Sequence, residues 1–119
     1  MGIANLFQKG KGIDEYVREA QADAKAVIVD VRSAREFADG HIKGAVNVPL
    51  NQVEHIKDAV ADMDTPLYVH CLSGARSSKA VMMLKKLGYT NVTNIGGVNS
   101  YKGSLVKGGG GSGGGGGAR

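Results

Sequence analysis

The chain has 119 residues, a formal net charge of +4 and a single cysteine. One cysteine excludes an internal disulfide, a paired-cysteine redox motif and a cysteine-rich zinc site. The basic residues are scattered rather than gathered in a stripe, which argues against a nucleic-acid partner, and no stretch approaches the roughly 20 apolar residues of a membrane span. We therefore expect a protein without metal ion or cofactor that binds neither nucleic acid nor a membrane.

The two ends of the chain differ from its middle. Residues 108–119 read GGGGSGGGGGAR, a composition that is typical of flexible coil and indicates a linker or an artificial tail. Residues 1–107 are long enough for one hydrophobic core, so we expect a single domain there. The N-terminal residues lack the long apolar segment of a signal peptide, and a lone thiol fits a reducing compartment, so we expect a cytoplasmic protein.

The first elements are indicated by hydrophobic spacing and by capping residues. Apolar residues at helical spacing predict a helix over 13–22. A continuous run rich in β-branched residues predicts a buried parallel strand over 26–31. Ser33 is suited to cap a short helix, and Gly40 is suited to end it.

The rest of the chain alternates between the same two kinds of element. The predicted order is a strand over 44–49, a helix over 51–62, a strand over 66–70, a helix over 76–87, a strand over 92–95 and a turn at Gly96-Gly97. Alternating strands and helices predict an α/β fold with a mainly parallel central sheet and helices on both faces. Active sites in such sheets lie at the carboxyl ends of strands, and Cys71 follows one of these ends.

The cysteine begins a loop that leads from a predicted strand into a predicted helix. The first N–H groups of a helix lack internal partners and carry partial positive charge, so they stabilise a thiolate, which is the nucleophilic form of cysteine. Arg76 adds a cation, and Gly74 lets the backbone turn tightly. We expect Cys71 to be catalytic. We expect the sulfur- and anion-binding loop to comprise Leu72, Ser73, Gly74, Ala75, Arg76 and Ser77.

Each of these residues also has a structural interpretation. Cys71 could be a buried packing thiol, although its loop position disfavours this. Arg76 could be a solvated side chain, but a helix start disfavours a cation that serves no anion. Ser73 and Ser77 could donate hydrogen bonds to the sulfur or simply tie the loop, and the sequence leaves both open.

Other polar residues near the loop are expected to be structural. His70 lies one residue before the thiol, and because strand side chains alternate faces we expect it to pack or hydrogen-bond rather than act as a base. We expect a structural role for His41 and an exposed position for His55. Three charged residues at the end of the first strand are interpreted as an ion-pair network that holds the strand to the next helix: Asp30, Arg32 and Glu36.

Taken together, the motifs resemble those of the single-domain rhodaneses, which are sulfurtransferases that use a cysteine persulfide. The resemblance covers nearly all of residues 13–102. It rests on Asp30-Val31-Arg32 followed by Glu36-Phe37 and residues 40–49, on the loop 71–77, and on Asn94-Ile95-Gly96-Gly97. The chain has no tryptophan, which many rhodaneses carry after the double glycine, and we expect Tyr101 to occupy that place.

The resemblance implies transfer of sulfane sulfur from a small anionic donor, thiosulfate or a persulfide, to a thiol or cyanide acceptor through a Cys71 persulfide. One alternative is a sulfur carrier that serves a partner protein. A phosphatase or arsenate reductase of the same fold is another, but those enzymes have five residues between cysteine and arginine, whereas four separate Cys71 from Arg76. A binding module without catalysis is disfavoured because the cysteine is present.

Overall fold

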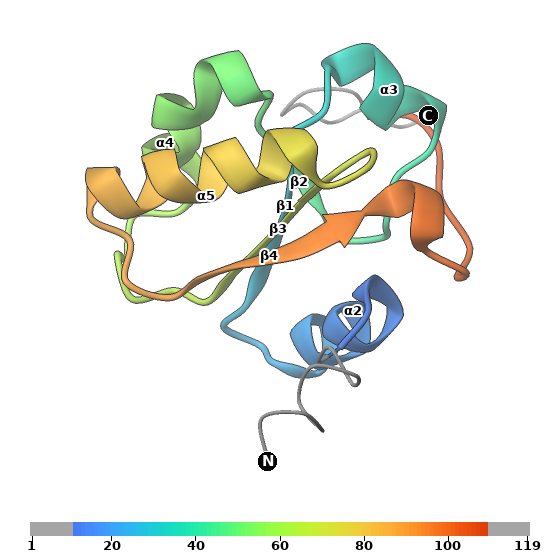
Figure 1. Cartoon of the computed structure of the whole chain (residues 1–119), viewed down its shortest axis with the longest axis horizontal. Helices are drawn as coiled ribbons and strands as arrows, with labels where there is room; N and C mark the ends of the chain where they lie inside the picture. The colour runs from blue at the N-terminus through green and yellow to red at the C-terminus, as the bar shows by residue number, and fades with distance from the viewer. Residues whose placement is uncertain (1–10, 110–119) are drawn as a thin grey trace.

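The protein forms one four-stranded parallel sheet with the strand order β2-β1-β3-β4 (Figure 1). The structure is a computed structural model that describes residues 11–109, so most of the predicted Gly-rich tail, residues 110–119, lies outside the described residues. The strands are β1 (Val27–Asp30), β2 (Val46–Asn47), β3 (Leu67–Cys71) and β4 (Val92–Gly97). The parallel sheet predicted from the alternation of elements is confirmed.

Helices cover both faces of this sheet. They are α2 (Ile13–Ala22), α3 (Ala34–Asp39), η1 (Leu50–His55), α4 (Ile56–Ala59), α5 (Ala75–Leu87) and η2 (Val98–Ser100). Helix α2 packs on one face, while η1, α4 and α5 pack on the other (Figure 1). Within residues 11–109, none of the helices has the length and apolar character that crossing a membrane requires.

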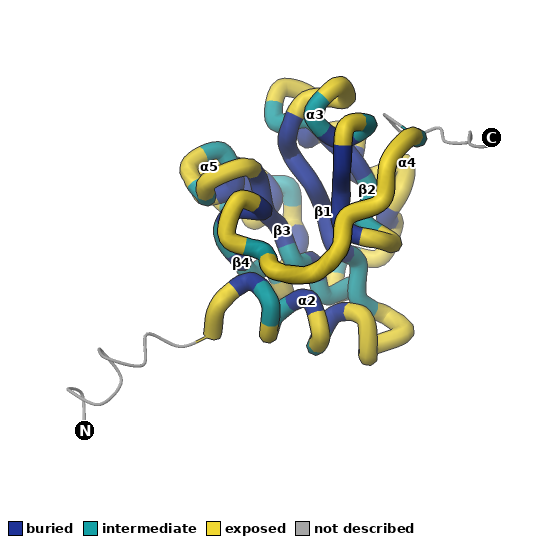
Figure 2. Tube along the Cα trace, turned by 90° about the vertical axis from the view of Figure 1, so that its right-hand side faces the viewer, coloured by how far each residue is buried: buried dark blue, intermediate teal, exposed yellow. Residues whose placement is uncertain are grey.

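The alternation of side chains along β3 decides which face carries the cysteine. Leu67, Val69 and Cys71 are buried in the core on the α5 side, whereas Tyr68 packs against the core on the α2 side. Figure 2 shows the central strands buried between exposed outer surfaces. The thiol therefore lies at the carboxyl end of a central strand and beneath the start of α5.

Two predicted elements differ from the structure. The predicted helix over 51–62 is a 3₁₀ helix followed by one short turn of α-helix that ends at Ala59. Its buried residues Val53 and Ile56 are three positions apart, which suits the three-residue repeat of a 3₁₀ helix. The predicted strand over 44–49 is regular only at Val46–Asn47.

The predicted turn at Gly96-Gly97 is wrong, because both glycines belong to β4. Val69 pairs with Asn94, but the next residue of β3, His70, pairs with Gly96, so Ile95 is an extra residue in a β-bulge. Gly96 has a φ of 104°, which favours glycine. The bulge lets β4 continue alongside the end of β3, next to the cysteine.

Candidate active site

The cysteine loop is a tight connection between β3 and α5. Cys71 is the last residue of β3, and α5 already begins at Ala75. Gly74 occupies the N-cap position with a φ of 108°, so a side chain there would strain the turn. The short loop folds the first N–H groups of α5 back over the sulfur.

Several donors converge on the Cys71 sulfur. The N–H groups of Gly74 and Ser77 donate to Sγ over 3.0 Å and 3.3 Å, and the Ser77 hydroxyl oxygen lies 3.6 Å away. Burial raises the pKa of the thiol, but the hydrogen bond between the thiol and the Ser77 hydroxyl, together with those from the N–H groups of Ser77, Gly74 and Ser73, outweighs it. The pKa of Cys71 is consequently lowered, which favours the thiolate.

The lowered pKa of Cys71 gives a testable prediction. Its alkylation rate, measured against pH with a small alkylating reagent, should rise with a midpoint below that of free cysteine in the same buffer, because only the thiolate reacts. Ser77→Ala should raise the midpoint, since it removes one stabilising hydroxyl. Ser104→Ala, at an exposed position, is the matched control. A wild-type midpoint at or above that of free cysteine would contradict the prediction.

Ser77 is itself held by a residue whose role the sequence did not reveal. The Ser77 hydroxyl oxygen lies 2.8 Å from Asn94 Oδ1, within hydrogen-bond distance, and Asn94 Nδ2 donates to the hydroxyl of Ser78 over 2.9 Å. Asn94 Oδ1 also accepts the N–H of Gly96, which fixes the bulge. The available signal was a polar residue within a predicted strand, two positions before the double glycine, but this signal did not identify the contact with Ser77.

The remaining loop residues act mainly through the backbone. The side chains of Leu72, Ser73 and Ala75 are exposed. The Leu72 carbonyl accepts the N–H of Asn99 over 3.0 Å, which ties the loop to η2. The Cys71 residue itself is only 1% exposed, so the loop covers the sulfur closely.

Arg76 is paired with a residue of a different helix. Its Nη1 and Nη2 atoms donate to the two carboxylate oxygens of Glu36 over 2.8 Å and 3.0 Å. Glu36 also completes a capping box with Ser33 at the start of α3. The Arg76 guanidinium and the Ser33 N–H lower the pKa of Glu36 to about 2. The cation expected in the cysteine loop is therefore part of an ion pair.

The charged network at the end of β1 is smaller than predicted. Arg32 donates through Nε and Nη2 to the Asp30 carboxylate, and its Nη2 also donates to the Gly40 carbonyl over 2.8 Å. Both side chains are buried. This pair holds β1 to the end of α3, as expected, but Glu36 pairs with Arg76 instead of joining it.

His70 does not face the thiol. Its ring is fully buried, and because the Cys71 carbonyl can only accept, Nδ1 donates to it over 3.1 Å. Burial lowers the pKa of His70, so the ring is neutral at neutral pH. Nε2 lies 3.7 Å from Asp30 Oδ2 without a hydrogen bond. This agrees with the expected structural role.

The two other histidines also lie away from the sulfur. His41 stacks on Phe37 at a centroid distance of 3.7 Å, and its Nδ1 lies 2.8 Å from the Phe37 carbonyl oxygen. His55 is exposed, as predicted. Among residues 11–109, no group of three or more His, Cys, Asp or Glu side chains is arranged to hold a metal ion.

Comparison with known proteins agrees with this geometry. Residues 14–104 match the family described as the rhodanese-like domain. The chain belongs to the rhodanese-like domain family. It is 38% identical over 104 residues to the thiosulfate sulfurtransferase PspE of Escherichia coli. This match covers 87% of this chain and all of the relative.

Two further relatives support the assignment. The uncharacterized protein YqhL of Bacillus subtilis is 40% identical over 82 residues, or 68% of this chain, and the match spans only 64% of that relative's length. The solved structure of a rhodanese with anions from E. coli is 37% identical with a TM-score of 0.66, and the match covers 70% of this chain and 99% of that one.

The double glycine of this rhodanese-like domain has a steric role. A Cβ on Gly97 would lie 2.2 Å from the Leu72 carbonyl oxygen and 2.4 Å from Ser73 Cα. These are backbone atoms of the cysteine loop and cannot move without displacing it.

Tyr101, expected to replace the family tryptophan, packs against the core on the α2 side.

Gly97→Ala should therefore disturb the cysteine loop. We expect it to lower the free energy of unfolding by about 1–3 kcal/mol, as overpacking does, and to reduce sulfur transfer by about 10²-fold, because a misplacement of about 1 Å has that effect. Gly12→Ala is the matched control, since a Cβ there meets nothing within 4 Å and φ is −93°. Urea unfolding and activity assays check both variants, and equal behaviour of the two would contradict the prediction.

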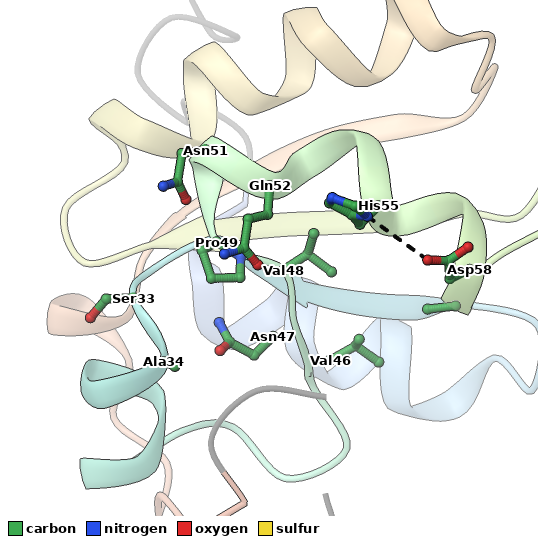
Figure 3. Close-up of a pocket in the computed structure, with 11 residues that line it drawn as sticks. Ser33, Ala34, Val46, Asn47, Val48, Pro49, Asn51, Gln52, His55 and Asp58 are labelled. Carbon is green, nitrogen blue, oxygen red and sulfur yellow. Dashed lines mark ion pairs between the residues drawn. The ribbon is translucent and has the colours of Figure 1, made fainter. Parts of the chain in front are cut away.

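A pocket of about 590 Å³ lies beside β2, away from the sulfur (Figure 3). Figure 3 shows Ser33 and Ala34 at one end and the weakly paired His55 and Asp58 at the other. None of the loop residues 71–77 lines it. Because Cys71 does not line this pocket, the candidate active site of this rhodanese-like domain is the cysteine loop.

Proposed function

We propose that this chain is a sulfurtransferase that moves sulfane sulfur from thiosulfate or a persulfide to a thiol or cyanide through a Cys71 persulfide. The observation that carries the proposal is the set of N–H donors of the loop that converge on the Cys71 sulfur. The full-length similarity to a protein named thiosulfate sulfurtransferase supports it. The catalytic residue would be Cys71, and residues 72–77 would form the sulfur-binding loop.

The first step forms the persulfide. The Cys71 thiolate attacks the outer sulfur of thiosulfate, the sulfur–sulfur bond of the donor breaks, and its electron pair leaves with sulfite. The products are sulfite and a Cys71 persulfide with one negative charge on its outer sulfur, so charge is conserved. The N–H groups of Gly74 and Ser77 already face the thiolate sulfur and can support this charge as it develops.

The second step returns the enzyme to its starting state. Cyanide or a thiolate attacks the outer persulfide sulfur, and the electron pair of the breaking bond returns to the Cys71 sulfur. With cyanide the product is thiocyanate. A protein that carries an acceptor thiol would serve equally, which keeps the sulfur-carrier alternative within the same chemistry. Since the Cys71 thiolate must stay reduced between cycles, a reducing compartment such as the cytoplasm suits this cycle.

A phosphatase is disfavoured by the size of the loop. Four residues separate Cys71 from Arg76, and the covering loop leaves the cysteine 1% exposed. A tetrahedral phosphoryl group needs more donors and more room than one sulfur atom. The pairing of Arg76 with Glu36 also withdraws the cation that such a group would require.

Intact mass measurement tests the proposal. Incubation with thiosulfate should add the mass of one sulfur atom to the protein, and cyanide should remove it, because the persulfide is the intermediate of the cycle. An aryl phosphate serves as the control substrate, and we expect no hydrolysis of it. Absence of the added sulfur, together with turnover of the aryl phosphate, would replace the proposed function by the phosphatase alternative.

A further inference from the structure

The charge of Arg76 at the candidate active site is balanced by Glu36. The two guanidinium nitrogens and the two carboxylate oxygens form a fork with distances of 2.8 Å and 3.0 Å. The same carboxylate accepts the N–H of Ser33 over 2.9 Å, which fixes it to the start of α3. Both side chains are partly buried, at 38% and 31% exposure. The pair is thus held in place and has no net charge.

The helix dipoles act in opposite directions on the two charges of this pair. Glu36 lies in the first turn of α3, where partial positive charge from the helix dipole stabilises a carboxylate. Arg76 lies in the first turn of α5, where the same effect disfavours a cation. Figure 1 shows α3 beside the loop that begins α5. Arg76 therefore gains from an anionic partner, and within the protein that partner is Glu36.

Donors of sulfane sulfur differ in charge. Thiosulfate is a dianion, whereas a thiosulfonate or a hydropersulfide carries no more than one negative charge. A donor that approaches a neutral ion pair gains little from Arg76, and its repulsion by the Glu36 carboxylate grows in proportion to its charge. The cysteine loop offers the N–H groups of Gly74 and Ser77 to one sulfur atom. It offers no unpaired cation to the second negative charge of thiosulfate.

We propose that Glu36 is a specificity-determining residue that masks Arg76 and so favours singly charged sulfane-sulfur donors over thiosulfate. The inference rests on the proposed sulfurtransferase function and names the class of donor that the same site prefers. Glu36 acts through Arg76 and through its own charge, without a role in bond formation.

Three variants separate charge from structure. Glu36→Gln removes the carboxylate charge but keeps an oxygen for the Ser33 N–H, because glutamine also completes a capping box. Arg76→Gln removes the cation. The double variant removes both charges, so the two positions together have no net charge, as in the wild type. It therefore tests whether charge alone decides the donor preference.

The assay compares thiosulfate with the methanethiosulfonate anion. In both cases the Cys71 thiolate attacks the terminal sulfur of the donor, and Cys71 becomes a persulfide anion. The electron pair of the broken sulfur–sulfur bond departs with sulfite, a dianion, or with methanesulfinate, a monoanion. With cyanide as acceptor, the kcat/KM for each donor reports on this first step alone.

Glu36→Gln should raise kcat/KM for methanethiosulfonate about threefold and for thiosulfate about tenfold, because the electrostatic free energy is linear in donor charge. For thiosulfate, the expected order is Glu36→Gln highest, wild type and double variant similar, and Arg76→Gln lowest. The gain of Glu36→Gln should shrink at high ionic strength, since screening weakens exposed charges.

Glu15→Gln is the matched control, since Glu15 is an exposed carboxylate on α2, across the sheet from α5. It should leave the ratio of the two kcat/KM values unchanged. An unchanged ratio in Glu36→Gln, or a double variant as slow with thiosulfate as Arg76→Gln, would overturn the masking role. Failure of the wild type to gain a sulfur atom from either donor by intact mass would instead overturn the proposed function, so the two failures are distinguishable.

Discussion

Replacing Cys71 by alanine should abolish persulfide formation and reduce sulfur transfer by on the order of 10³-fold or more, as loss of a nucleophile does in other enzymes. Cys71 is the only cysteine of the chain, so no second thiol can take its place. Its sulfur is the atom on which the N–H groups of Gly74 and Ser77 converge. Without it, those donors have no nucleophile to stabilise.

Two measurements check the cysteine prediction. Intact mass after thiosulfate treatment should show no added sulfur, and the thiosulfate-to-cyanide assay should fall to the rate of the uncatalysed reaction. Circular dichroism should show an intact fold, since alanine removes only one buried atom from a core that many residues share. Cys71→Ser is the second variant, because its hydroxyl can still accept from the loop N–H groups. Substantial activity of either purified variant would refute the role of Cys71.

Replacing Asp30 by asparagine should cost about 3–5 kcal/mol of stability, the range seen when one partner of a buried ion pair is removed. The Asp30 side chain is fully buried and accepts from Arg32 Nε and Nη2 over 3.0 Å and 2.7 Å. It also accepts the backbone N–H of Arg32. The variant leaves the guanidinium, whose side chain is 6% exposed, without a counter-charge. Domains have only about 5–15 kcal/mol of stability in total, so the loss is large.

Urea unfolding measures this effect. Asp58→Asn is the matched control, because Asp58 also faces a basic side chain, His55, but its side chain is 88% exposed. Exposed pairs contribute only about 0–1 kcal/mol, so the control should unfold close to the wild type. An Asp30→Asn variant as stable as Asp58→Asn would show that the buried pair does not support the end of β1.

The sequence by itself determined the features that depend on neighbouring residues. Ser33 caps α3 as its position predicted, and Glu36, three residues later, completes a capping box there. Gly74, where a tight turn was predicted, has a positive φ and precedes α5, and α5 ends at Leu87 as the spacing predicted. The strand, loop and helix around Cys71 follow from the same local spacing, and they place the thiol under the first N–H groups of a helix.

The sequence also left some local features undecided. Helical spacing over residues 51–62 did not separate a 3₁₀ helix from an α-helix, because Val53 and Ile56 fit both repeats. The bulge at Ile95 depends on pairing with β3 and is invisible within β4. These differences arise because a short segment takes the conformation that its packing partner requires.

Only the tertiary structure decided the partners of the site. Glu36 and Arg76 are 40 residues apart, and Asn94 and Ser77 are 17 apart, so neither contact follows from local spacing. Parallel strands end at the same edge of the sheet, which brings the starts of α3 and α5 and the bulge of β4 together there. The role of Cys71 could be predicted from the sequence because the N–H groups that donate to its sulfur follow it within six residues. The net charge that a sulfur donor meets at the site could not be predicted, because it depends on Glu36, which only the fold places beside Arg76.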